Sequence, residues 1–204
     1  PEVVYCLDTV SSMGGTKIEV DRLGVDICIT STQKCLGLPP GMAICLISQK
    51  AVEAAKQVEF RGVYFDLLEL YNYIQKKDYQ YPSTPSLSHM FALDYQLDRI
   101  LEEGLENRFA RHLEMAKYVR EWAKEYFDLF PEEKYASNTL TVIKNTRNIN
   151  VAELNKKLGE CGYMISNGYG DLKELTFRIA HMGDIGLDGI KELLSTINSI
   201  LKLN

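Results

Sequence analysis

A lysine follows the second of three short apolar runs in this 204-residue chain. Lys34 lies in the loop formed by residues 31–41, directly after the apolar run at residues 27–30. Most lysines are exposed amines, and spacing alone favours that role. The carboxyl end of a buried strand is, however, where doubly wound folds bind ligands. A lysine desolvated there would have a lowered pKa, and its neutral amine could act as a base, a nucleophile or a Schiff-base former.

Asp8 follows the first apolar run, at residues 3–7. Taken alone, it is typical of a carboxylate that caps a turn. If the first two apolar runs are neighbouring strands, spaced by about 4.8 Å, Asp8 and Lys34 could face one flat heterocycle. The carboxylate would then keep a pyridine nitrogen protonated while the lysine holds an aldehyde carbon.

Arg178 lies in the segment Thr-Phe-Arg-Ile-Ala, residues 176–180. Strand alternation places Phe177 and Ile179 on one face and Arg178 on the other. An ion pair or a stem lying along apolar surface is one interpretation of Arg178. The other is a bidentate fork for a substrate carboxylate. We interpret the neighbouring His181 as structural.

The composition is that of one folded domain or two small ones. Of 204 residues, 46% are hydrophobic and 25% charged, which excludes a disordered or fibrous chain. A formal charge of -5 and a pI near 5.3, without a block of Lys and Arg, argue against nucleic acid as a partner. No apolar run approaches the roughly 20 residues of a membrane span. The five cysteines form no C-x-x-C pair, and we expect reduced thiols in the cytoplasm and no metal site.

The first half of the chain predicts a sheet with helices. Three short apolar runs lack the alternation of half-exposed strands and predict a sheet covered on both faces, at residues 3–7, 27–30 and 42–47. A helix is expected over residues 48–58, with Ser48 as its N-cap. Residues 64–81 are unusually aromatic, which we interpret as packing. A second helix is expected over residues 86–103.

The second half predicts a small α+β layer. A long helix over residues 105–130 follows Gly104 and leads into a second domain. The remaining elements are expected in the order strand 138–143, helix 151–161, strand 163–166, strand 175–180 and helix 187–202. Gly162 is expected to close the middle helix. We therefore predict a domain boundary between residues 103 and 104.

Four motifs resemble those of one enzyme family. They are, in chain order, DTVSSMGG at 8–15, QKCLGLPPG at 33–41, PSTP at 82–85 and FRIAHMG at 177–183. They are similar to motifs of the class V pyridoxal-phosphate aminotransferases, most of all the alanine–glyoxylate and serine–pyruvate aminotransferase branch. Because all four occur in the family's order, the resemblance is specific.

The resemblance implies roles for residues around the cofactor, pyridoxal 5'-phosphate. Lys34 matches the lysine that forms the internal aldimine, and Asp8 matches the carboxylate that pairs with the pyridine nitrogen. Val10 matches the residue that packs on one face of the cofactor ring. Gln33 matches a side chain near the phosphate.

The resemblance also implies a homodimer with the cofactor site at its interface. Tyr81 and Thr84 match residues that reach across to the neighbouring subunit's phosphate, and Thr84 aligns more firmly than Tyr81. Arg178 matches the arginine that holds the substrate α-carboxylate.

The implied fold is α/β, of pyridoxal-phosphate transferase fold type I. Residues 1–103 would be the C-terminal part of the large domain, a mostly parallel sheet with helices on both faces. Residues 104–204 would be the small C-terminal α+β domain. Family members are nearly twice this length, and the part without a match here is their amino-terminal half. That half supplies the phosphate-capping loop and a ring that stacks on the cofactor, so the chain from Pro1 is expected to hold half of the cleft.

The implied function is transamination between a small amino acid, alanine or serine, and a small 2-oxo acid, glyoxylate or pyruvate. It would be ping-pong, through the Lys34 aldimine. Cysteine desulfurases have a similar fold but carry His at the position of Gln33 and need a mobile cysteine, whereas we interpret Cys161 as structural. A phosphonate-amine transaminase and a non-catalytic subunit or fragment are further alternatives.

Overall fold

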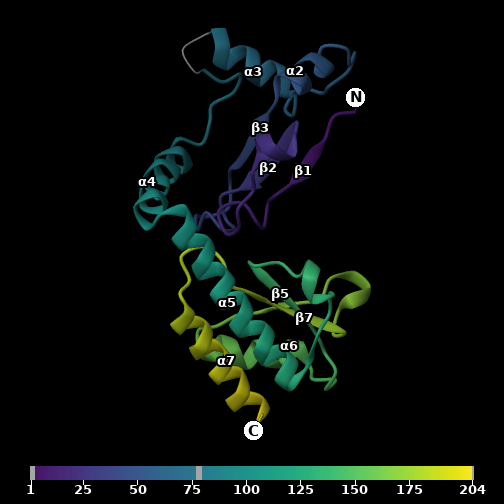
Figure 1. The fold of residues 1–204 in the computed structure, drawn as a ribbon, viewed down its shortest axis with the longest axis vertical. Coiled ribbons are helices and arrows are strands. Elements are labelled where there is room, and N and C mark those ends of the chain that lie inside the picture. The colour runs from purple at the N-terminus through teal and green to yellow at the C-terminus, as the bar shows by residue number, and fades with distance from the viewer. Residues whose placement is uncertain (1–2, 77–79, 204) are drawn as a thin grey trace.

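The computed structural model describes residues 3–76 and 80–203. Pro1, at the start of the chain, and Tyr79, in the aromatic segment, lie outside the described residues. The described strands form two separate sheets, one from each half of the chain. In Figure 1 the first sheet lies in the upper part, the second lies in the lower part, and helix α5 runs down from the junction. This arrangement supports the predicted division at residue 103, which remains a prediction.

The first sheet has three strands in the order β1-β2-β3. Strand β1 (Cys6–Asp8) pairs in parallel with β2 (Ile27–Ser31), and β2 pairs in antiparallel with β3 (Ala43–Ile47). The sheet is therefore mixed within this chain. The first strand starts later than residue 3 and includes Asp8, whose partner in the register is Ile29.

Burial varies from residue to residue in this sheet. Cys28 and Thr30 are buried, whereas Ile29 is 42% exposed and Leu46 is 49% exposed. In the register Leu46 pairs with Cys28 and Ile29 pairs with Cys45, so the two exposed residues lie on opposite faces and the covering expected on both faces is incomplete on each. The apolar residues of these strands favour contact with other apolar side chains, whether or not such side chains cover them here.

Four helices belong to the first half: α1 (Val20–Leu23), α2 (Gln49–Ala55), α3 (Leu67–Lys76) and α4 (Leu87–Glu103). Ser48 is the N-cap of α2, as predicted, and its Oγ accepts a hydrogen bond from Ala51 N at 3.1 Å. Helix α3 lies inside the aromatic segment, where no helix was predicted. The interpretation of that segment as packing is wrong for Tyr64 and Phe65, which are 77% and 82% exposed.

The second half forms an antiparallel sheet in the order β4-β5-β7-β6. Its strands are β4 (Asp128–Leu129), β5 (Leu140–Lys144), β6 (Ser166–Asn167) and β7 (Thr176–Ala180). Its helices are α5 (Leu105–Tyr126), α6 (Val151–Glu160) and α7 (Leu187–Leu201), with short 3-10 turns at Glu133–Tyr135 and Gly170–Leu172. Helix α5 ends before residue 130 because Phe127 leaves the helical conformation and the chain enters β4. The strand expected at 163–166 is found at Ser166–Asn167.

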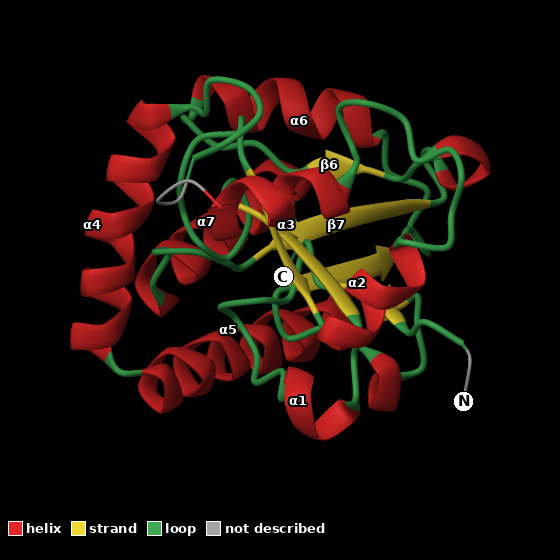
Figure 2. Ribbon diagram, turned by 90° about the horizontal axis from the view of Figure 1, so that it is seen from above, coloured by secondary structure: helices red, strands yellow, loops and turns green. Residues whose placement is uncertain are grey.

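The main hydrophobic core lies in the second half. Met115 and Val119 of α5, Ile143 of β5, Phe177 of β7 and Ile197 of α7 all have exposed fractions of 0%. Helices α4 and α5 run along the outside of the molecule in Figure 2. Among the described residues, no helix is both long and apolar enough to cross a membrane.

Candidate functional site

Lys34 lies in a tight loop after β2 that buried Thr32 holds closed. Thr32 Oγ1 donates a hydrogen bond to the carbonyl oxygen of Pro39 at 2.9 Å. The amide of Gly37 donates to the carbonyl oxygen of Lys34 at 2.9 Å, in a turn where Gly37 has a left-handed φ of 72°. The Lys34 side chain is half-buried rather than fully desolvated. The loop therefore presents the amine at the carboxyl end of β2, as predicted.

Asp8 lies at the carboxyl end of the adjacent parallel strand. Its Oδ1 accepts a hydrogen bond from Val10 N at 2.8 Å, so the carboxylate caps the turn after β1. Thr9 N and Thr9 Oγ1 both donate to the carbonyl oxygen of Ile29, at 2.9 Å and 2.8 Å. These bonds hold the end of β1 against β2, which confirms that the first two predicted strands are neighbours.

A hollow of about 540 Å³ brings Lys34 and Arg178 together. The first half of the chain lines it with Ser11, Gln33 and Lys34, and the second half with Tyr169 and Arg178. Asp8 and Val10 do not line the hollow but lie in the turn that leads to Ser11. The hollow is therefore formed jointly by residues from both halves of the chain.

Arg178 is half-buried on β7, and its neighbours Phe177 and Ile179 are fully buried in the core. This confirms the predicted alternation of the strand. Arg178 Nε donates to the carbonyl oxygen of Asn167 at 3.1 Å. The guanidinium carbon lies 3.8 Å from the centroid of the Tyr169 ring.

Tyr169 was not predicted as a site residue. It is 76% exposed. A hydrogen bond from the Arg178 guanidinium, the largest effect, lowers the pKa of its phenol, and the positive charges of Arg178 and, to a smaller extent, Lys34 lower it further. An aromatic residue between two glycines, Gly168 and Gly170, is the one sequence signal that could have drawn attention to it.

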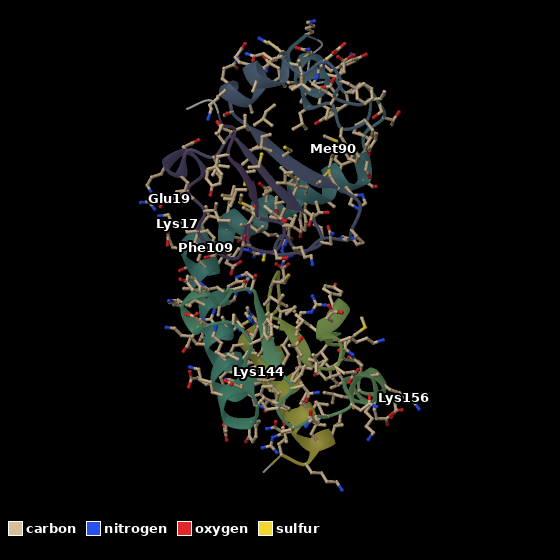
Figure 3. All side chains as sticks on the ribbon, turned by 90° about the vertical axis from the view of Figure 1, so that its right-hand side faces the viewer. Lys17, Glu19, Met90, Phe109, Lys144 and Lys156 are labelled. Atoms are coloured by element: carbon tan, nitrogen blue, oxygen red, sulfur yellow. The ribbon has the colours of Figure 1, made fainter. Side chains whose placement is uncertain are left out.

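Tyr81 and Thr84 lie elsewhere. Both are exposed and line a second hollow of about 560 Å³, which includes Leu87 and Met90 and shares no residue with the first. Figure 3 labels Met90 in the upper part of the molecule, well above Lys144 of the second sheet. The structure therefore does not bring Tyr81 and Thr84 to Lys34 within one chain.

An ion-pair network centred on the buried Arg108, also missed from the sequence, reaches the hollow at Asp184. Arg108 donates to Glu103 Oε2 at 2.6 Å, and Arg111 donates to Glu103 Oε1 at 2.7 Å. Burial acts to raise the pKa of Glu103, but the hydrogen bonds from Arg111 and Arg108 outweigh it and hold that pKa below its ordinary value. Arg108 also contacts Asp184, which lines the hollow.

His181 is fully buried, which agrees with a structural role. Its burial also makes the stability of the protein depend on pH. Its Nε2 lies 2.8 Å from Thr141 Oγ1, and burial lowers its pKa from the ordinary 6.5 to about 4. Because the folded pKa lies below the unfolded one, the unfolded chain binds the proton first as the pH falls. The stability is therefore intact above pH 6.5 and is lost progressively between pH 6.5 and 4.

We expect His181 to reduce the free energy of unfolding by about 2 kcal/mol between pH 7 and pH 5. Urea denaturation of the native protein and of His181→Gln at the two pH values measures how much the free energy of unfolding of each changes between pH 7 and pH 5. The variant should lose about 2 kcal/mol less over that interval. An equal loss in both proteins would show that His181 is not the responsible group.

Comparisons with known proteins identify the family of this chain. The family model described as Aminotransferase class-V matches residues 1–173. An uncharacterized aminotransferase of Methanocaldococcus jannaschii is 39% identical over 199 residues, 96% of this chain and 51% of that protein. Serine–glyoxylate aminotransferase of Arabidopsis thaliana is 34% identical, over 96% of this chain and 49% of that protein.

The fold is similar to that of solved aminotransferases. The crystal structure of pyridoxamine–pyruvate aminotransferase from Mesorhizobium loti matches with a TM-score of 0.90 at 27% identity, over 98% of this chain and 52% of that one. The chain thus spans about half the length of the relatives it matches. It belongs to the class V aminotransferases, a family of pyridoxal-phosphate enzymes.

Proposed function

We propose that this chain carries the lysine and the carboxylate-binding arginine of an aminotransferase. The enzyme would move an amino group by a ping-pong mechanism from a small amino acid, alanine or serine, to a small 2-oxo acid, glyoxylate or pyruvate. The name of the Arabidopsis relative, serine–glyoxylate aminotransferase, supports small substrates. The observation that carries the proposal is the hollow that joins Lys34 to Arg178.

The residues near the hollow fit pyridoxal phosphate. Lys34 offers a primary amine for the aldehyde, and Asp8, at the end of the adjacent parallel strand, offers a carboxylate for the pyridine nitrogen. Asp8 Oδ1 already accepts a hydrogen bond from Val10 N, and its second oxygen takes no part in that bond. Val10 would pack on the ring, and Gln33 would lie near the phosphate.

Each of these residues has a distinct task in the proposed reaction. Bound pyridoxal phosphate supplies an electron sink for the charge that forms when an amino acid loses its α-proton. The Lys34 amine takes that proton as a general base and returns it as a general acid. Asp8 keeps the pyridine nitrogen protonated. Arg178 holds the substrate carboxylate with a pair of parallel N–H bonds.

A homodimer is part of the proposal. Tyr81 and Thr84 are exposed and lie in a hollow separate from Lys34. This position supports contact with the cofactor phosphate of a second subunit rather than of their own. A reducing, cytoplasmic compartment is also proposed, from the cysteine pattern of the sequence.

The test is to incubate the native protein with alanine or serine and with glyoxylate or pyruvate. Formation of both products, with parallel double-reciprocal lines, is the expected result for a ping-pong transaminase. Sulfide release from added cysteine would favour a desulfurase, and transfer from an aminoalkyl phosphonate a phosphonate-amine transaminase. A colourless protein without any transfer would favour a non-catalytic subunit.

Arg178→Ala should weaken substrate binding far more than cofactor binding. Loss of a charge-assisted bidentate contact of about 3 kcal/mol corresponds to a rise of about 100-fold in KM for both substrates. Steady-state kinetics and titration with pyridoxal phosphate measure the two effects. Arg147→Ala, which removes an arginine bound to the Tyr126 carbonyl outside the hollow, is the control. An unchanged KM in Arg178→Ala would remove this residue from the proposal.

A further inference from the structure

The guanidinium of Arg178 is restrained on two of its sides. Its Nε is engaged by the carbonyl oxygen of Asn167 at 3.1 Å. One of its faces lies against the Tyr169 ring, with the guanidinium carbon 3.8 Å from the ring centroid. Arginine stacks on aromatic faces in this way while its N–H groups remain free in the guanidinium plane. The terminal edge, with its two nitrogens, is therefore the edge left for a planar anion.

The turn that carries Tyr169 is tightly built. Asn167 Oδ1 accepts hydrogen bonds from the amides of Gly168 and Glu174, at 2.8 Å and 2.9 Å. A side chain at Gly168 would lie 2.0 Å from the carbonyl oxygen of Leu172, so this position has no room for a Cβ. The same asparagine thus closes the turn with its side chain and restrains Arg178 with its carbonyl.

The Tyr169 ring belongs to the lining of the hollow that also holds Lys34 and Arg178. A hydrogen bond from Arg178 to its phenol has the largest effect in lowering the phenol's pKa, and the charges of Arg178 and Lys34 add to it. Stacking on the face of a guanidinium does not occupy the N–H groups at its edge. A carboxylate can therefore meet Arg178 while the ring stays in contact.

We propose that Tyr169 is a positioning residue for the substrate carboxylate, acting through Arg178. Together with the Asn167 carbonyl, its ring holds the guanidinium plane so that the two terminal nitrogens face the hollow. We assign this task to the ring, whose centroid lies 3.8 Å from the guanidinium carbon, and the phenylalanine variant separates it from the hydrogen bond that the phenol accepts from Arg178. The inference rests on the proposed role of Arg178 and adds a residue to that site.

Three variants test the inference in the native protein. Tyr169→Ala should raise KM for both the amino acid and the oxo acid about tenfold, with kcat and cofactor affinity unchanged. Tyr169→Phe keeps the ring and should restore the KM of the native protein. Tyr135→Ala is the matched control, because Tyr135 is 74% exposed and has Lys134 at 4.7 Å from its ring centroid, away from the hollow.

Binding of pyruvate provides a second measurement that needs no turnover. Calorimetric titration without an amino donor should show a dissociation constant about tenfold higher for Tyr169→Ala than for Tyr135→Ala. An unchanged or lower constant would overturn the inference, and a lower one would mean that the ring covers Arg178. The native protein could lack transaminase activity and still bind pyruvate more tightly than Tyr169→Ala does. That result would support the positioning role while refuting the proposed function.

Discussion

Lys34→Ala is expected to abolish transamination and the visible absorbance of the bound cofactor. The amine is proposed both to hold the cofactor aldehyde and to move the α-proton, and general acid–base catalysis alone contributes about 10²- to 10⁴-fold. We therefore expect kcat to fall by at least about 10³-fold. Absorbance spectra and initial rates with alanine and glyoxylate measure the two effects.

Two further variants show whether the amine itself is responsible. Lys34→Arg keeps a positive charge in the loop but has no primary amine, so it should also lose the absorbance. Lys173→Ala removes an exposed lysine that does not line the hollow and should leave both measurements unchanged. If Lys34→Ala kept the absorbance of the native protein, Lys34 would not be the residue that holds the cofactor.

The placement of Lys34 and Asp8 was predictable because it depends on local signals. Each residue follows a short apolar run, and the polar residues after the run mark the end of a strand. The structure places both at the carboxyl ends of two parallel, adjacent strands. Strand alternation likewise predicted which side of β7 carries Arg178.

The contacts of Arg178 with Tyr169 and Asn167 were not predictable in this way. They depend on the register between β6 and β7, in which Ser166 pairs with Arg178, and on a turn closed by side-chain hydrogen bonds. Neither feature leaves a periodic pattern in the sequence. The exposure of Ile29 and Leu46 was also missed, because an apolar run indicates that its residues favour burial but not which element covers each of them.

Arg108 is the clearest case of a long-range contact hidden from the sequence. Its side chain is 2% exposed, although it lies on a helix with many charged residues. Arg108 Nε donates to the carbonyl oxygen of Gly14 at 3.0 Å, and one terminal nitrogen donates to that of Cys35 at 2.7 Å. These partners are 94 and 73 residues away in the chain, and Cys35 directly follows Lys34.

Arg108→Met is accordingly expected to reduce the free energy of unfolding by about 3–5 kcal/mol, because it leaves the carbonyl oxygens of Gly14 and Cys35 without this donor and removes one of the two arginines that pair with the half-buried Glu103. A loss of this size is a large part of the total stability of an ordinary domain. Arg99→Ala is the matched control: Arg99 also pairs with Asp184, at 2.8 Å, but its side chain is 51% exposed. An exposed pair contributes about 1 kcal/mol or less, so urea denaturation should separate the two variants. Equal losses would mean that the burial of Arg108 adds nothing to the stability of the loop that carries Lys34.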